Sequence, residues 1–144
     1  MSITPLAAPG PSVLNGRMTR LPWKAGALQM HSGPYYISAT RFTYDTLRSL
    51  SGVIWHGLRL RSGWPQIDGA VGLSVMVEIR TRSTYTISVW TSHAELQSWV
   101  RTAHHARLVK AYRPRLIDSA YEGWQATTLD LAECWRHALR RIGA

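Results

Sequence analysis

Residues 84–113 read Thr-Tyr-Thr-Ile-Ser-Val-Trp-Thr-Ser-His-Ala-Glu-Leu-Gln-Ser-Trp-Val-Arg-Thr-Ala-His-His-Ala-Arg-Leu-Val-Lys-Ala-Tyr-Arg. The first part is dominated by β-branched and aromatic residues, which favour a half-buried strand at 85–90. Ser92 and Glu95 then have the spacing of a capping box, which marks the start of a helix. One apolar face follows at helical spacing, formed by Leu96, Trp99, Val100 and Ala103. The stretch therefore predicts a strand that leads directly into a helix at 92–112.

Periodic segments on both sides of this unit predict the remaining elements. We expect strands at residues 35–42, 71–82, 85–90 and 116–125, and helices at 44–60 (with Thr43 as N-cap), 92–112 and 128–142. Followed by an extra C-terminal helix, this order is the ferredoxin-like βαββαβ arrangement of an α+β protein. Its two inner helices would cover one face of an antiparallel sheet. The other face would be exposed in a monomer, so two copies are expected to pair through it in a two-fold dimer.

Residues 1–33 differ in composition from the rest of the chain. They are rich in proline and glycine, which interrupt helices and strands. We therefore expect an N-terminal extension that drapes over a ferredoxin-like domain at 34–144 or is partly disordered. The side chains that would anchor the extension are Leu21, Trp23, Leu28 and Met30. Within the domain, the first helix would bury the stripe Leu47, Leu50, Ile54 and Leu58.

The composition limits the class of protein. The 144 residues include 17 Lys or Arg and 8 Asp or Glu, for a net charge of +9. This charge suits an anionic ligand or nucleic acid, but zinc-ligand spacing, a glycine-rich phosphate loop and a helix-turn-helix pattern are absent from the sequence, so nucleic acid is the less favoured partner. No apolar run could span a membrane and the N-terminus does not resemble a secretory signal, so we expect a cytoplasmic protein with no membrane partner. The single cysteine, Cys134, is expected to be a buried, inert thiol.

Two short runs carry a resemblance to a known family. Residues 88–99, Ser-Val-Trp-Thr-Ser-His-Ala-Glu-Leu-Gln-Ser-Trp, and residues 102–105, Thr-Ala-His-His, resemble the dimeric α+β-barrel superfamily. The nearest branches are the antibiotic biosynthesis monooxygenase-like and spheroidene monooxygenase-like proteins. The resemblance implies a homodimer with a ligand cavity between helices and sheet in each protomer. Ala103 stands where a proline is common, and the pattern of the haem-degrading branch is missing, so haem degradation is not expected.

The best titratable candidates lie at the end of this resemblance. His105 or His104 could act as a general base or ligate haem iron. On a continuous helix His105 would lie opposite Leu96, so it faces inward only if the helix breaks near Thr102. The alternative is that both histidines lie at the surface. Arg41 is the third catalytic candidate, because a buried arginine needs an anionic partner, either a substrate oxyanion or an internal acid.

Four further side chains are candidates for contact with substrate. They are Trp55, His56, Trp90 and Tyr121. The aromatic rings could form the walls of a pocket for a flat substrate, and the alternative is ordinary core packing. Glu78 and Glu122 could serve as bases, but a solvated strand face is their default environment.

Together with the resemblance, these residues suggest an enzyme that acts on a hydrophobic, polyketide-like or aromatic substrate. The reaction would be cofactor-independent oxygenation, or a cyclisation or isomerisation with similar requirements. A haem protein of the same fold, and a non-catalytic protein that uses the basic surface to bind a ligand or nucleic acid, are the alternatives. The fold hosts several chemistries, so it does not choose among them.

Overall fold

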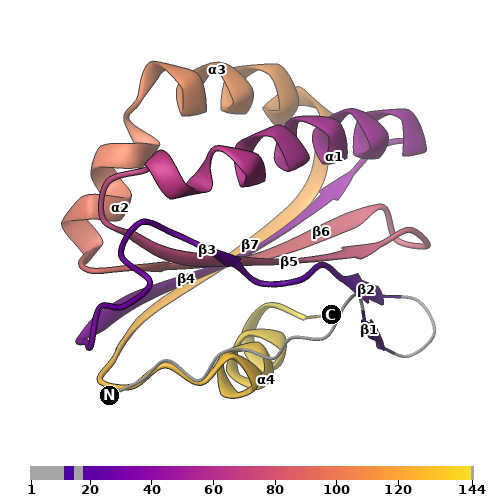
Figure 1. Ribbon diagram of the computed structural model, residues 1–144. Coiled ribbons are helices and arrows are strands. Elements are labelled where there is room, and N and C mark those ends of the chain that lie inside the picture. The colour runs from indigo at the N-terminus through magenta and orange to yellow at the C-terminus, as the bar shows by residue number, and fades with distance from the viewer. Residues whose placement is uncertain (1–11, 15–17, 144) are drawn as a thin grey trace.

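A computed structural model describes residues 12–14 and 18–143 as one antiparallel sheet with helices on both faces (Figure 1). The helices are α1 (Leu47–Ser62), α2 (His93–Val100), α3 (Ala103–Tyr112) and α4 (Leu131–Ile142), with short 3-10 turns η1 (Trp64–Gln66) and η2 (Arg113–Arg115). The strands are β1 (Ser12–Leu14), β2 (Met18–Arg20), β3 (Lys24–Ala25), β4 (Tyr35–Tyr44), β5 (Ala70–Glu78), β6 (Ser83–Trp90) and β7 (Leu116–Ala126). No helix within these residues is long and apolar enough to cross a bilayer.

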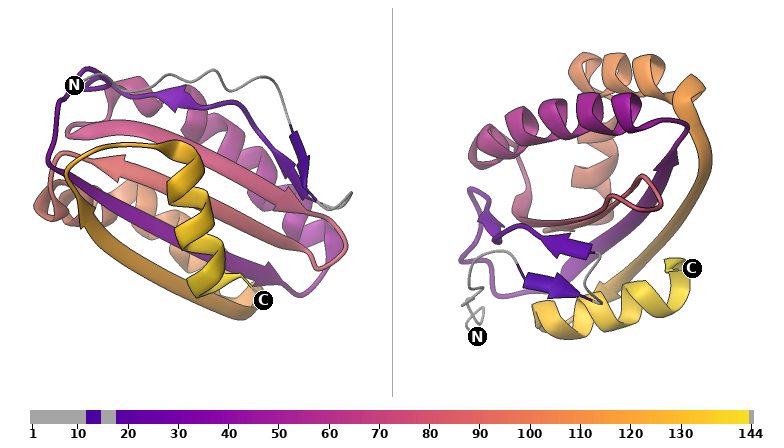
Figure 2. Two further views of the ribbon diagram at one scale, coloured as in Figure 1. Left: turned by 90° about the horizontal axis from the view of Figure 1, so that it is seen from below. Right: turned by 90° about the vertical axis from the view of Figure 1, so that its right-hand side faces the viewer.

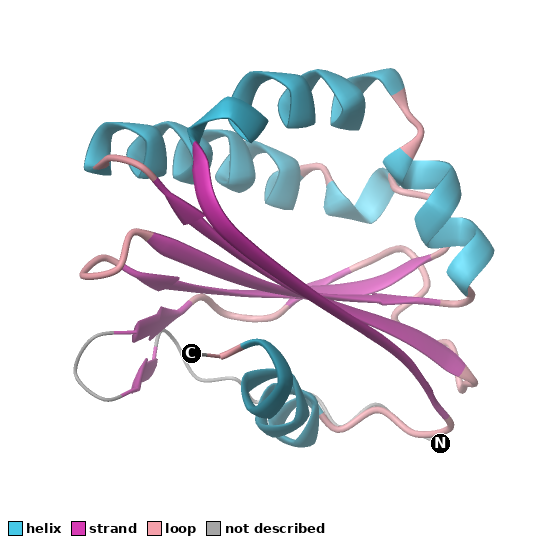
Figure 3. Cartoon of the chain, turned by 180° about the vertical axis from the view of Figure 1, so that it is seen from behind, coloured by secondary structure: helices cyan, strands magenta, loops and turns pink. Residues whose placement is uncertain are grey.

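The order of strands in the sheet confirms the predicted ferredoxin-like arrangement. Along the sheet the strands run β1-β2-β5-β6-β4-β7, and β3 pairs with β5 beside β2. The long strand β4 lies inside the sheet, antiparallel to β6 on one side and to the edge strand β7 on the other. As Figure 3 shows, α1, α2 and α3 form one layer over this sheet, whereas α4 lies beneath it. The α+β fold class and the extra C-terminal helix are thus as expected.

Strand β4 divides its side chains between two separate cores. Ile37 and Ala39 are fully buried on the α4 side, as their alternation in the sequence predicted. Tyr36 faces the helix layer, where it packs against a second cluster built around Trp90 and Leu96. The sheet is therefore covered by helices on both faces.

The C-terminal helix corrects our expectation that one sheet face would be free. Trp135, Ala138 and Ile142 of α4 are buried against this face, and the Trp135 indole N–H donates to Ser74 Oγ at 3.0 Å. Burial raises the pKa of Cys134 to about 12, in keeping with an inert thiol. The amphipathic α4 covers this face in place of a second sheet. Association of two copies therefore stays a prediction, with its surface unassigned.

The N-terminal segment joins the sheet within the described residues. β2 and β3 both pair antiparallel with β5, and the Trp23 ring lies directly over Gly72. The prediction that Leu28 and Met30 anchor this segment is wrong, because their side chains are 43% and 84% exposed. Residues 1–11 and 15–17 lie outside the described residues.

Helix α1 differs from its prediction in its start and in its buried face. The strand before it extends to Tyr44, with the Thr43 hydroxyl bonded to Ser83, so the N-cap is Thr46, whose Oγ1 accepts from Ser49 N at 3.0 Å. Leu50 is buried as expected, but Leu47 and Leu58 are 57% and 45% exposed. Tyr112 of α3 lies close to Gly52, so this side of α1 faces α3, and part of the predicted stripe faces outward.

We expect Gly72→Ala to destabilise the fold by about 1–3 kcal/mol, because its Cβ would overlap the Trp23 ring. Urea unfolding measures this loss. Gly57→Ala is the matched control, since no atom lies within 4 Å of the added Cβ and alanine favours the helix. Equal midpoints for Gly72→Ala and the wild type would show that Trp23 does not occupy this position.

Candidate functional site

The site begins with a break in the helical segment that follows β6. Helix α2 ends at Val100 and α3 starts at Ala103, so the predicted single helix at 92–112 is two helices. Thr102 caps the second one: its Oγ1 accepts from the backbone N–H of His105 at 3.4 Å, and its hydroxyl donates to the Trp99 carbonyl at 2.7 Å. The break near Thr102, on which an inward His105 depended, is therefore present.

Three tryptophans form the structural floor beneath this break. Trp90 at the end of β6 and Trp64 in η1 are almost fully buried, with ring centroids 5.3 Å apart. Trp99 from α2 packs on both, at 5.7 Å from Trp90 and 5.9 Å from Trp64. The Trp90 indole N–H donates to Ser88 Oγ at 2.9 Å, which satisfies its polar atom inside the core. The cluster thus fixes α2, and with it the start of α3, against the sheet.

His105 is held in one orientation by this floor and by the helix break. Its ring packs on Trp99, with centroids 4.5 Å apart, and its Nδ1 lies 3.2 Å from the Val100 carbonyl oxygen. Because a carbonyl oxygen can only accept, this hydrogen bond requires the proton on Nδ1 and leaves Nε2 as an acceptor. Burial lowers the pKa of His105, an effect that the Val100 hydrogen bond partly opposes and that nearby His104 reinforces. A neutral imidazole with a free Nε2 is the geometry of a general base.

An open groove of about 560 Å³ lies along α3 beside this imidazole. Its lining is Val100, His105, Ala106, Val109, Lys110, Arg113 and Pro114. Val100, Ala106, Val109 and Pro114 are apolar, and His105 and the two cations are the exceptions. The groove can therefore accept a flat hydrophobic molecule, with one base and two positive charges available to an acidic hydroxyl or its anion.

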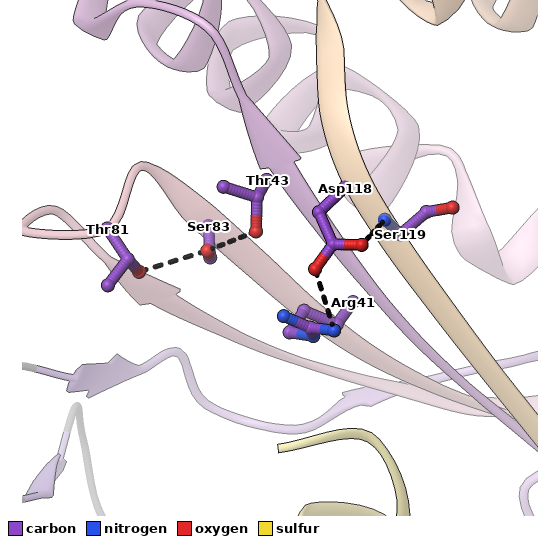
Figure 4. A network of polar contacts seen from close by, with 6 residues as sticks. All are labelled: Arg41, Thr43, Thr81, Ser83, Asp118 and Ser119. Atoms are coloured by element: carbon purple, nitrogen blue, oxygen red, sulfur yellow. Dashed lines mark hydrogen bonds and ion pairs between the residues drawn. The ribbon is translucent and has the colours of Figure 1, made fainter. Parts of the chain in front are cut away.

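Two of the three predicted catalytic residues are not part of this groove. His104 is exposed on α3 and does not line it. Arg41 lies on the opposite face of the sheet, in the row of Ile37 and Ala39, and its guanidinium reaches the Asp118 carboxylate at 3.2 Å (Figure 4). Its anionic partner is thus an internal acid, so Arg41 cannot act together with His105 on one substrate.

The four predicted substrate contacts are also dispersed. Trp55 is 60% exposed on α1, and His56 packs edge-to-face on Tyr112 between α1 and α3, with centroids 5.6 Å apart. Trp90 belongs to the buried floor behind His105, which is core packing. Tyr121 is exposed on β7, where its hydroxyl lies 2.8 Å from that of Tyr36.

Sequence reasoning missed Trp99 as the support of His105, and Lys110 and Arg113 as the charges of the groove. The spacing of residues in the sequence could have identified Arg113 as a neighbour of His105, provided that the helix break is assumed. Counted from Ala103, His105, Val109 and Arg113 recur every four residues, so a helix that begins there places them on one side.

Neither carboxylate considered as a base faces the groove. Glu122 lies on the α4 side of β7, 3.6 Å from His137 Nε2, and Glu78 accepts from Thr81 at 2.7 Å. Within the part of the chain that the structure describes, no three His, Cys, Asp or Glu residues are grouped as metal ligands.

No family model and no curated protein matches this sequence. Solved structures do match its fold. SnoaB, a cofactor-independent oxygenase from Streptomyces nogalater, is 19% identical, with a TM-score of 0.54 over 69% of this chain and 98% of that one. A candidate antibiotic biosynthesis monooxygenase from Deinococcus radiodurans is 11% identical, with a TM-score of 0.56 over 63% and 91% of the two chains.

Some matched structures are longer than this chain. A candidate monooxygenase from Lactobacillus acidophilus is 12% identical, with a TM-score of 0.52 over 67% of this chain, which spans 50% of that protein's length. These identities establish the fold and not the activity. The chain therefore shares the fold of these structures, which is the fold that the resemblance at residues 88–105 implied.

Removal of the Thr102 cap tests whether it maintains the helix break. Thr102→Ala should lower the free energy of unfolding by about 1 kcal/mol, because the first turn of α3 loses its acceptor. Thr102→Ser keeps a hydroxyl at the same position and should stay within a few tenths of a kcal/mol of the wild type. Urea denaturation of the two variants provides the comparison, and an unchanged Thr102→Ala protein would contradict this role.

Proposed function

We propose that the protein is a monooxygenase-like enzyme of secondary metabolism that oxygenates a hydrophobic, polyketide-like or aromatic substrate without a cofactor. The observation that carries this proposal is the position of His105 in the groove, with Nδ1 bonded to Val100, Nε2 left as an acceptor and a pKa that burial lowers. Cofactor-independent oxygenation needs such a base, because the deprotonated substrate itself must reduce dioxygen. The shared fold of SnoaB, named as an oxygenase of this kind, supports the same chemistry.

The proton transfer assigns a role to each atom of the imidazole. Nε2 of His105 takes the proton of a phenol or enol hydroxyl, while the Nδ1–H bond to Val100 keeps the ring in place. The substrate anion transfers an electron to dioxygen, and the resulting radical pair combines at carbon to form a hydroperoxide, protonated by His105. The hydroperoxide then loses water, which takes its OH group and the hydrogen on the same carbon, and a quinone carbonyl remains. Oxygen is reduced, substrate carbon is oxidised, and no further reductant is needed.

Lys110 and Arg113 would stabilise the anion that this base creates. Both cations line the groove that contains His105, so they lie where the anion would form. They take the role that the sequence suggested for Arg41, which instead pairs with Asp118. The same base and cations would serve an enolisation that leads to cyclisation or isomerisation, which is the related alternative reaction.

A haem protein is the second candidate, and one observation favours it. Haem-ligating histidines commonly donate their Nδ1–H to a carbonyl or carboxylate, as His105 does to Val100. His105 would then be the iron ligand, and bound haem would supply redox chemistry at iron. Titration of the purified protein with haemin distinguishes the candidates. A Soret shift that His105→Ala removes would favour haem, whereas no saturable shift would exclude this role.

His105→Ala should reduce oxygen consumption with a dihydroxy-aromatic substrate by roughly a hundredfold or more, because the general base is lost. His104→Ala is the matched control, since it removes a neighbouring imidazole that does not line the groove. An oxygen electrode, with no metal or flavin added, provides the measurement. Full activity in His105→Ala would contradict the proposed base.

The pH dependence gives a second test of the same residue. Since burial lowers the pKa of His105, its neutral form persists to lower pH than in an ordinary histidine with a pKa of about 6.5. The rate should therefore fall on the acid side only below that value. An acid limb of kcat/KM that lies at or above pH 6.5 would assign the titration to another group.

A further inference from the structure

The outer face of α1 carries apolar side chains that no other element covers. Leu47, Trp55 and Leu58, which we call the α1 stripe, are 57%, 60% and 45% exposed. At about 100° per residue their positions fall within one side of the helix, away from the side that Gly52 and His56 turn toward α3. Exposed apolar side chains that cluster on one helix face mark a surface for interaction.

The same layer of helices is strongly basic. Figure 2 shows α1 and α3 side by side above the sheet, on the side away from α4. The sequences of α1, α3 and η2 contain no acidic residue. Their exposed cations are Arg48, Arg59, Arg107, Lys110, Arg113 and Arg115. Glu95 in α2 and Asp45, just before α1, are the acidic residues of this region, so the surface of α1, α3 and η2 carries mainly positive charge.

We propose that the helix layer binds the surface of an anionic lipid bilayer, with the α1 stripe inserted at the interface. Arg48 and Arg59 lie on the same outward side of α1 as Trp55 and can contact lipid phosphates while the stripe enters the acyl boundary. Tryptophan suits this depth, since its ring is apolar and its N–H is polar. We expected no membrane partner because no segment could span a bilayer, and surface binding needs no such segment.

The other occupants of such a surface fit it less well. A second copy that packed α1 against α1 in a two-fold pair would bring Arg48 and Arg59 toward the arginines of the other helix, which contains no acidic residue itself and has only Asp45 just before it. A nucleic acid would use the cations but would leave Leu47 and Leu58 without an apolar partner. An anionic bilayer offers both phosphate and hydrocarbon at one surface. It is also where a hydrophobic substrate of the groove would accumulate.

Cosedimentation of the full chain with lipid vesicles tests the proposal. We expect binding to mixed phosphatidylserine and phosphatidylcholine vesicles, weakened by salt, and little binding to pure phosphatidylcholine. The double variant Trp55→Ser/Leu58→Ser should lower the partition coefficient roughly tenfold or more. Its control is Ile79→Ser, which removes a similarly exposed apolar side chain, 54% accessible, from the β5–β6 turn. Both sets of positions are exposed, so thermal denaturation should report intact folds.

A second pair of variants separates the charge from the apolar contact. Arg48→Gln/Arg59→Gln should also weaken binding roughly tenfold. Arg140→Gln/Arg141→Gln removes the same net charge from exposed positions on α4, at the other face, and should change binding less than about twofold.

Three outcomes would overturn the proposal. The first is no binding to the mixed vesicles, or binding that Trp55→Ser/Leu58→Ser leaves unchanged. The second is a dimer in light scattering that this variant dissociates, which would assign the stripe to a second copy. The third is tight binding of a single-stranded oligonucleotide that depends on Arg48 and Arg59 but not on Trp55 and Leu58, without vesicle binding. None of these results depends on oxygenase activity, so they are independent of the His105 tests.

Discussion

The packing of Trp64, Trp90 and Trp99 is the contact on which the rest of the structure depends. The three rings come from η1, β6 and α2, so one cluster joins a turn, the sheet and the helix layer. Large aromatic side chains contribute much of the burial energy of a small core. Here they also set a position: Trp99 is both a member of the cluster and the surface against which His105 rests. Stability and the candidate site therefore share one side chain.

The helix break at Thr102 determines where His105 lies relative to the tryptophan cluster. Helical spacing on an unbroken segment would direct His105 away from the face that carries Leu96 and Trp99. The break at Thr102 restarts the helix, and His105 and Val109 of α3 line one groove with Arg113 of η2. The groove then combines an apolar lining with a base that burial keeps neutral and with two cations. Each property derives from local backbone geometry rather than from a recognisable catalytic motif.

The order of elements and the two rows of β4 were predictable, because periodicity in the sequence records which side chains share a face. The conditional role of His105 could also be stated from helical spacing alone. Arg41 was misassigned because alternation shows that it is buried with Ile37 but not which face of the sheet carries the site. The burial of α1 was overestimated because the side of the helix that faces α3, where Tyr112 approaches Gly52, depends on a contact between distant segments. The packing of α4 on the second sheet face is likewise a long-range contact, and local sequence patterns do not predict it.

The protonation state of His105 is the most direct test of this account. Nitrogen-15 NMR of the folded protein reports both the pKa of each imidazole and the nitrogen that carries the proton, and comparison with His105→Gln assigns the signal. We expect a pKa below the ordinary value of about 6.5 and a neutral form protonated at Nδ1, bonded to Val100. A pKa at or above that value, or a proton on Nε2, would show that His105 is not the buried base of this groove.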